Sequence, residues 1–184
     1  METPSKSAFT LSKVKLMKDG GLDCHFEIEQ KCGEEIYNEK YHTESAKDVH
    51  PDLRACFDKL KPVLARVYHM SFFRTLLDSP DFGASKLQQE FAETAFAEIM
   101  QKINVTGVAL SGSDENVGFV ISGTFTADSN QKMAINSHRM KFKDTRYGFE
   151  QECEEIIATL EEEAYAFLYE GKKAQLELFS GEEE

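Results

Sequence analysis

The sequence predicts an α+β fold built from two similar units, each a three-stranded antiparallel meander followed by a helix. Two separate stretches of the chain alternate apolar and polar residues between turn signals, which predicts the strands. A stretch with apolar residues at helical spacing follows each of them. Because one unit alone would leave a sheet face exposed, the antiparallel sheets should pair or share a core packed on the helices.

The first unit is expected over residues 11–69. Its strands are expected at residues 13–16, 22–29 and 36–43, and the last two are joined by the turn signal Cys32-Gly33-Glu34. The alternation is clearest in the second strand, which predicts a half-buried antiparallel strand.

The helix of this unit should begin at Pro51, because proline suits the first helical position. Pro62 lies inside the same pattern and should kink or divide the helix. A further helix over residues 84–102 is expected to link the two units.

The second unit is expected over residues 103–171. Its strands are expected at residues 105–110, 117–125 and 131–142, and its helix at residues 149–169. The repeated order of elements indicates an internal duplication, although a meander followed by a helix is also a common arrangement.

The ends of the chain differ from this domain. Residues 1–10 are polar and are expected to be a flexible N-terminus. Residues 11–171 should form a single domain, and residues 172–184 an extended acidic tail that carries a peptide motif.

The acidity of the chain is concentrated near its C-terminus. The 184 residues carry a formal net charge of −12, from 33 acidic and 21 basic side chains. Residues 149–184 hold 12 acidic and two basic side chains, so the rest of the chain is close to neutral. This argues against a protein that coats nucleic acid by bulk charge, but it leaves room for a local basic site. Such asymmetry often marks an interaction segment, and a solvated helix face explains it equally well.

Several classes of protein are disfavoured. No apolar run approaches the roughly 18 residues that a membrane span needs, and no signal peptide is expected. The four cysteines lie far apart, which favours reduced thiols in a cytoplasm over a disulfide scaffold. The chain has no serine-hydrolase elbow, P-loop or zinc-protease motif, so we expect neither an enzyme nor a cofactor.

One cluster raises the question of zinc. Cys24, His25, Cys32 and His42 fall within one hairpin, but their spacing matches no usual ligand motif. Strand alternation places Cys24 and His25 on opposite faces. We therefore expect Cys24 in the core, both histidines on the sheet surface, and no metal.

A basic and aromatic segment follows the last predicted strand. Mixed cations and aromatic rings can follow a phosphate backbone and stack bases, as in proteins that hold single-stranded nucleic acid. A charge-protected sheet edge is the alternative, and Phe142 would suit the core. Lysines of the first strand would extend the surface if the two units pair. The candidate residues are His138, Arg139, Lys141, Lys143, Arg146 and Tyr147, with Lys13, Lys15 and Lys18 as the extension.

The most specific motif is Gln175-Leu176-Glu177-Leu178-Phe179, close to the C-terminus. It resembles the pentapeptide by which bacterial DNA polymerases and repair factors dock on the sliding clamp. The resemblance implies that Leu178 and Phe179 fill an apolar pocket, that Leu176 adds contact, and that the Gln175 amide bonds at the rim. The alternative is that these apolar side chains pack back on the body, because they would otherwise be exposed.

The whole chain also resembles small proteins carried in phage and prophage genomes, some of them beside recombination functions. The similarity lies in the segments Lys13-Val14-Lys15-Leu16-Met17, His50-Pro51-Asp52-Leu53 and Val108-Ala109-Leu110-Ser111-Gly112. It supplies no catalytic residues.

These observations together predict a non-catalytic, phage-type accessory protein of DNA replication or recombination. It would dock on a bacterial sliding clamp through its C-terminal peptide and bind single-stranded DNA. One alternative is an acidic inhibitor or DNA mimic that blocks a host enzyme, with the glutamates of residues 150–163 imitating phosphates. Another is a structural phage component. The oligomeric state stays open.

Overall fold

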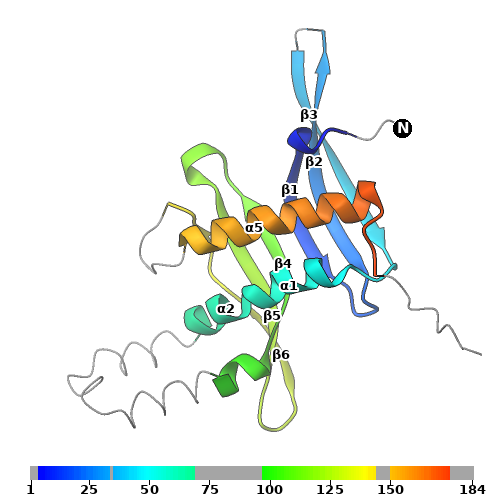
Figure 1. Ribbon diagram of the computed structural model, residues 1–184. Coiled ribbons are helices and arrows are strands. Elements are labelled where there is room, and N and C mark those ends of the chain that lie inside the picture. Colours follow the sequence, from blue (N-terminus) through cyan, green and yellow to red (C-terminus); the bar gives the residue numbers. More distant parts are fainter. Residues whose placement is uncertain (1–3, 34, 69–96, 144–149, 175–184) are drawn as a thin grey trace, which may run out of the picture.

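The computed structural model describes residues 4–33, 35–68, 97–143 and 150–174. Within these ranges the alternating segments form one seven-stranded antiparallel sheet (Figure 1). The strand order is β3-β2-β1-β4-β5-β6, and the short strand β7 also pairs with β5. The strands are β1 (Phe9–Leu16), β2 (Leu22–Cys32), β3 (Glu35–Ser45), β4 (Ile103–Ser111), β5 (Gly118–Thr126), β6 (Lys132–Asn136) and β7 (Met140–Lys141).

The two meanders join through their first strands, β1 and β4, at the centre of the sheet. Val14 lies opposite Val108, with Lys13 opposite Ala109 on one side and Lys15 opposite Gly107 on the other. Both valines are buried, at 0% and 2% exposure. The expected α+β class with antiparallel strands is therefore confirmed, and the sheet is continuous across the two meanders.

Each central strand carries a bulge. In β1 the pairing with β2 shifts between Leu11 and Lys13, and in β4 the pairing with β5 shifts between Val105 and Gly107. An extra residue at a bulge breaks the period of two, so the inward-facing residue after Leu11 is Val14. β1 begins at Phe9, inside the stretch that the sequence predicts to be flexible. The broken period explains why the alternating pattern does not reveal this early start. Phe9 is 3% exposed, and a 3-10 turn at Lys6–Ala8 precedes it.

The helices lie on one face of the sheet. They are α1 (Pro51–Lys59), α2 (Lys61–Tyr68) and α5 (Glu150–Tyr165), and α5 continues into the π-helical turn Ala166–Glu170. Residues 97–102, directly before β4, are also helical, and the rest of the expected linking helix lies outside the described residues. The division of the first helix near Pro62 is confirmed. No helix in the described ranges is long and apolar enough to cross a membrane.

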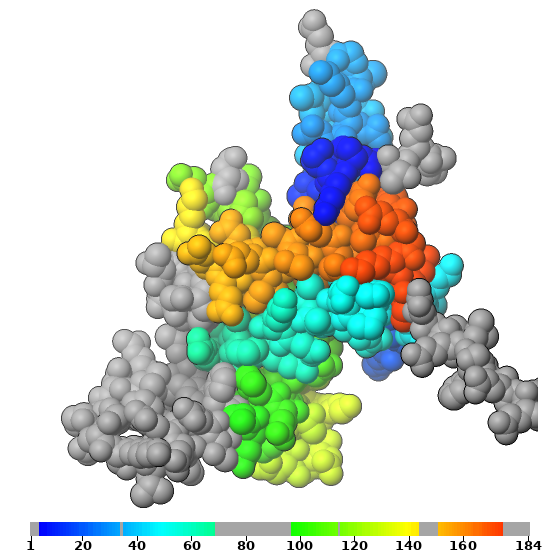
Figure 2. Space-filling model, in the orientation of Figure 1, coloured from blue at the N-terminus to red at the C-terminus, as the bar shows by residue number. Residues whose placement is uncertain are grey.

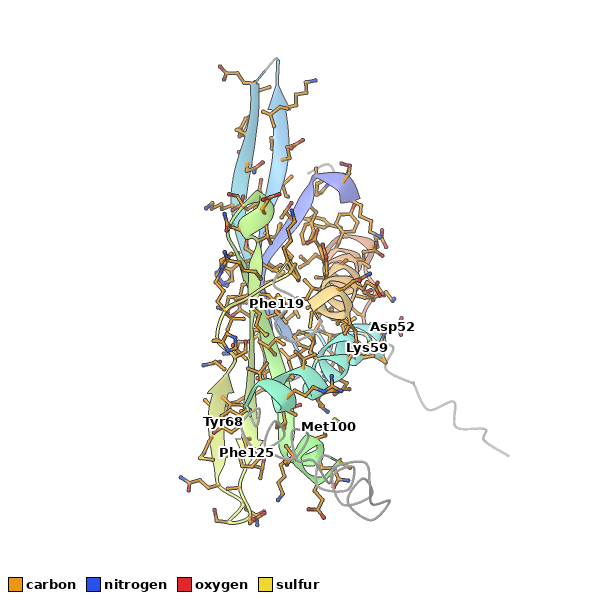
Figure 3. All side chains as sticks on the ribbon, turned by 90° about the vertical axis from the view of Figure 1, so that its left-hand side faces the viewer. Asp52, Lys59, Tyr68, Met100, Phe119 and Phe125 are labelled. Atoms are coloured by element: carbon orange, nitrogen blue, oxygen red, sulfur yellow. The ribbon has the colours of Figure 1, made fainter. Side chains whose placement is uncertain are left out.

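The core fills the space between the helices and one face of the sheet. Figure 2 shows α5 and α1 running side by side over this face, and Figure 3 shows the sheet edge-on with the helices on one side. The apolar stripes of the two helices have the same spacing. They are Leu53, Cys56 and Phe57 in α1 with Leu60 at its C-cap, and Cys153, Ile156, Ile157 and Leu160 in α5. Burying a large side chain of this kind stabilises the fold by roughly 1.5–3 kcal/mol.

The last predicted strand of the second unit, residues 131–142, is divided into β6 and β7. The Ser137 backbone N–H donates to the Ile121 carbonyl at 2.9 Å, but the Ile121 N–H donates to the Ser137 hydroxyl, also at 2.9 Å. A side-chain oxygen thus takes the place of the carbonyl that a continuous ladder would use, and β6 ends at Asn136.

Candidate nucleic-acid interface and C-terminal junction

The face of the sheet opposite the helices is not covered by any described element (Figure 3). Strand registers arrange its side chains in two rows that run across the sheet from β3. One row ends on β6 and contains Glu44, Asp23, Lys15, Gly107, Ser122 and Asn136. The other ends on β5 and contains His42, His25, Lys13, Ala109 and Val120.

Lys13 and Lys15, which we call the β1 lysines, form the basic part of these rows. The Lys13 ammonium lies 3.8 Å from the Asp23 carboxylate. Lys15 is exposed and has no ion pair with another residue in the described ranges. Its stem crosses the backbone at Gly107, where a Cβ would lie 3.6 Å from Lys15 Cβ and Cγ. The tighter contact of such a Cβ would be with the Val14 carbonyl oxygen at 3.1 Å, so the glycine suits the close approach of the β1 backbone.

Beyond the β1 lysines, the face becomes small and uncharged. We call this part of β4 and β5 the neutral strip; its residues are Gly107, Ala109, Gly118, Val120 and Ser122. These side chains carry little bulk, so the neutral strip is a shallow surface without formal charge.

Two further cations border the neutral strip on its other side: Arg139, directly before β7, and Lys141, within it. We call them the β7 cations. Lys141 pairs with Gly118 across β5 and β7, and the Arg139 guanidinium lies over Gly118. From β1 to β7 there are three strand spacings, which is about 14 Å at about 4.8 Å each.

The β7 cations also hold the loop between β4 and β5. Arg139 donates to the Ser111 hydroxyl at 2.9 Å and to the Ser111 carbonyl at 2.8 Å, and it also contacts the Asn116 carbonyl. Lys141 donates to the Asn116 side chain at 2.9 Å. Lys143 pairs with Glu115 at 3.0 Å. The guanidinium and ammonium groups of this segment therefore have structural partners, and an anionic ligand would have to share them.

The other residues of the predicted basic segment have different placements. Phe142 is half-buried, and its ring stacks on that of Phe119 with the ring centroids 4.9 Å apart. It therefore packs against the core, as one of the two interpretations of the sequence expects. His138 is exposed. Arg146 and Tyr147 lie outside the described residues.

The chain after α5 is fastened to the body by a lysine. Gly171 ends the helix with a φ of 74°, a left-handed conformation that favours glycine. Lys172 Nζ then lies 2.7 Å from the Asp52 carboxylate and 2.8 Å from that of Glu163. The Asp52 and Glu163 hydrogen bonds raise the pKa of Lys172 above its usual range, and the same lysine lowers the pKa of Asp52.

Two backbone contacts complete this C-terminal junction. Lys173 forms a β-bridge with Val49, and the Ala174 N–H donates to the Asp48 carbonyl at 3.2 Å. Residues 172–174 thus belong to the folded body, although the sequence pattern predicts them to be part of the extended tail. The peptide Gln175, Leu176, Leu178 and Phe179 begins at the next position and lies outside the described residues.

Part of the acidic helix is used to hold the fold together. Glu161 accepts a hydrogen bond from the Leu11 N–H at 3.3 Å, and burial raises the pKa of this carboxyl. Glu162 lies 3.2 Å from Lys6, and Glu163 binds Lys172. These three glutamates therefore link α5 to the N-terminal segment, to β1 and to the C-terminal junction.

The placement of the cysteines and histidines agrees with the alternation in β2. Cys24 is fully buried, and burial raises the pKa of its thiol to about 12. His25 lies on the opposite face, and Cys32 is exposed.

His25 and His42 lie directly opposite each other, a pairing that the sequence patterns above do not predict. The turn between β2 and β3 predicts this pairing. With Cys32 paired to Glu35 across a two-residue turn, each step back along β2 matches a step forward along β3, which brings His25 to His42.

Comparison with known proteins adds no assignment. No protein-family model matches the chain, and no curated protein or solved structure is significantly similar to it.

Proposed function

We propose that this protein is a non-catalytic, phage-type accessory factor of DNA replication or recombination. It binds single-stranded DNA on the open face of its sheet and docks on a bacterial sliding clamp through the peptide Gln175–Phe179. The observation that carries the DNA part is the pairing of β1 with β4, which sets the β1 lysines beside the neutral strip. The Gln-Leu-Glu-Leu-Phe motif carries the clamp part.

The open face offers two kinds of contact to a single strand. The β1 lysines and the β7 cations are flexible or forked cations that can bind phosphates from both sides of the neutral strip. The glycines and small side chains between them let the strand lie close to the sheet. Binding of this type is electrostatic, does not depend on base sequence and weakens as salt is raised.

A double helix fits the protein less well. Reading duplex DNA needs a helix or a two-stranded ribbon that enters the major groove. The β2–β3 hairpin projects beyond α5 as such a ribbon (Figure 1). Its glutamates lie on both faces of the ribbon, Glu27 and Glu29 on the open face and Glu35 and Glu39 on the other, and a phosphate backbone would repel them. The acidic hairpin therefore disfavours insertion into a groove, and the part of the open face between the β1 lysines and the β7 cations is left for a single strand.

The acidity of the chain is compatible with this surface. The exposed glutamates of α5, including Glu152, Glu154 and Glu155, lie in the helix layer. The helix layer is separated from the open face by the sheet (Figure 3). Repulsion between DNA and these carboxylates is thus weakened by distance and by salt.

The C-terminal junction supports the tethering role. It fastens the chain at Lys172 and Ala174, one residue before Gln175. A body docked through the peptide would be held near the clamp, and this raises the effective concentration of its DNA-binding face at the replication site.

We further infer that residues 11–69 and 103–171 are two copies of one βββα unit. Three features support the duplication: the symmetric pairing about Val14 and Val108, the bulges at equivalent positions of β1 and β4, and the identical stripe spacing in α1 and α5. The pairs Lys13–Ala109 and Gly107–Lys15 exchange under this symmetry, so the two copies differ in charge where DNA would bind.

Two binding measurements test the proposed function. The full-length protein should bind a purified bacterial sliding clamp, and the double variant Leu178→Ala, Phe179→Ala should not, although its thermal unfolding is unchanged. Both proteins should bind single-stranded oligonucleotides equally and with a steep salt dependence. If both give the same clamp-binding isotherm, the tether is refuted. Salt-dependent binding to a basic protein without any binding to DNA would favour the acidic-inhibitor alternative.

A further inference from the structure

We propose that Asp23, His25 and His42 form a binding site for a divalent transition-metal ion, with zinc as the best match. All three residues lie on the open face, two on β2 and one on β3. One ligand atom from each lies within 4.8 Å of the other two. The sequence predicts no metal here, because the spacing of Cys24, His25, Cys32 and His42 matches no usual ligand motif and because alternation places Cys24 and His25 on opposite faces.

The ligand atoms are spaced as they are around a bound zinc ion. The Asp23 Oδ1 atom lies 3.4 Å from His25 Nε2 and 3.0 Å from His42 Nε2. In a tetrahedral zinc site with bonds near 2.0–2.1 Å, ligand atoms are about 3.3 Å apart. The two imidazole rings stack at 4.1 Å with an angle of 12° between their planes. Both Nε2 atoms thus lie beside the same carboxylate oxygen. Because the lone pairs of stacked rings point in parallel directions, one ring must turn about its χ2 angle when an ion binds.

The donor set suits zinc chemically. Two imidazoles and one carboxylate are common ligands of zinc and of related first-row metals, whereas magnesium and calcium prefer oxygen ligands alone. Three protein ligands leave a fourth position for water or for a ligand from outside. Glu44 Oε1 lies 3.6 Å from His42 Nε2, so this neighbouring carboxylate could also approach the fourth position.

The surroundings hold the carboxylate in place. Asp23 is the least exposed of the three ligands, at 18%, and its second oxygen, Oδ2, faces the Lys13 ammonium at 3.8 Å. This contact leaves Oδ1 for the histidines. A charged neighbour that binds the other oxygen of a metal-binding carboxylate orients it toward the ion.

A second group of potential ligands differs in an informative way. His50, Asp52 and Glu163 also lie close together on the helix side. The Lys172 ammonium binds both carboxylates of that group, so a cation of the protein already neutralises it. In the Asp23 group, the Lys13 ammonium lies 3.8 Å from Oδ2, whereas Lys172 lies 2.7–2.8 Å from its two carboxylates. The oxygen that faces the histidines is the other one, Oδ1.

A bound ion would join β3 to β2. β3 is an edge strand, and its residues are almost all exposed. The ion would add a cross-link between positions 25 and 42, in the half of the β2–β3 pairing that is farther from the turn. Binding that occurs only in the folded state also raises the temperature of unfolding.

The test is a zinc titration of the full-length, tag-free protein by calorimetry, with cobalt spectroscopy as a second readout. The wild type should bind one zinc ion at this site, and cobalt should give the visible absorption of a low-coordinate complex. His25→Ala, His42→Ala and Asp23→Asn should each weaken binding at least about tenfold, because even a residue that only orients a ligand contributes that much.

Matched variants serve as controls. Glu27→Gln removes another carboxylate from the same face of β2, and His50→Ala removes a histidine from the Lys172-neutralised group. Both should bind zinc as the wild type does. No saturable binding by the folded wild type would overturn the proposal. So would unchanged affinity in the folded His42→Ala and Asp23→Asn variants, or loss of the site in His50→Ala. Because no DNA or clamp is present, the result does not depend on the proposed function.

Discussion

The Lys15 side chain lies over Gly107, so that the most exposed cation of β1 reaches across the central strand pair toward β4. A side chain at position 107 would meet the Val14 carbonyl at 3.1 Å and the Lys15 stem at 3.6 Å. The glycine thus keeps the neutral strip low at the point where the first meander meets the second, and the stem of Lys15 lies beside it.

Arg139 should be important for stability as well as for charge. Arg139→Ala removes three hydrogen bonds to the loop between β4 and β5, and it should lower the free energy of unfolding by about 1–2 kcal/mol, since these bonds involve a charged donor near solvent. Arg139→Lys should restore only part of the loss, because an ammonium cannot reproduce the fork. Urea denaturation measures both. An Arg139→Ala variant as stable as the wild type would show that these hydrogen bonds do not hold the loop.

The cysteines should differ sharply in reactivity. Cys32 is exposed, whereas Cys24, Cys56 and Cys153 are buried. Burial raises the pKa of Cys24 to about 12 and also raises that of Cys56, so both remain thiols at neutral pH. A thiol reagent should label Cys32 rapidly in the native protein, and all four residues after denaturation. Peptide mass spectrometry identifies the labelled sites, and rapid native labelling of Cys24 would contradict the placement of β2.

Glu161 should make stability depend on pH. Its raised pKa means that the folded protein holds a proton there more tightly than the unfolded chain does. Stability therefore falls as the pH rises from the ordinary glutamate pKa through the raised one. Glu161→Gln should be more stable than the wild type at neutral pH, and this gain should shrink in acid, where the wild-type carboxyl is protonated.

The control for this prediction is Glu162→Gln, next in sequence and paired with Lys6 at the surface. Its difference from the wild type should not follow the same pH profile. Denaturant unfolding across the acidic range measures both variants. A Glu161→Gln variant less stable than the wild type at neutral pH would show that the Leu11 hydrogen bond requires the charged carboxylate.

Local patterns predicted much of this fold. Alternation in β2, the two-residue turn at Gly33 and the proline at position 62 each act over a few residues, and each produces the expected element. The end of β6 at Asn136 was missed because it depends on a hydroxyl group, that of Ser137, taking over a ladder bond. The early start of β1 was missed because a bulge interrupts the period that reveals a strand.

The candidate site was only partly predictable for a related reason. Sequence patterns identify Lys13, Lys15 and Arg139 as cations near strands, but not which strands become neighbours. The pairing of β1 with β4 joins positions about 94 residues apart, and it depends on packing of the helices as well as on the strands. That pairing decides that the β1 lysines and the β7 cations face the same neutral strip.

The measurement that tests this account most directly compares Lys15→Glu with Lys59→Glu in binding to a single-stranded oligonucleotide across a range of salt concentrations. Both variants reverse one exposed lysine, but Lys59 lies in the helix layer (Figure 3). Lys15→Glu should weaken binding several-fold and make the salt dependence shallower by about 0.7 for each phosphate that the protein no longer neutralises, whereas Lys59→Glu should bind as the wild type does. If the two variants bind equally, or the wild type shows no salt-dependent binding, the open face is not a DNA-binding surface.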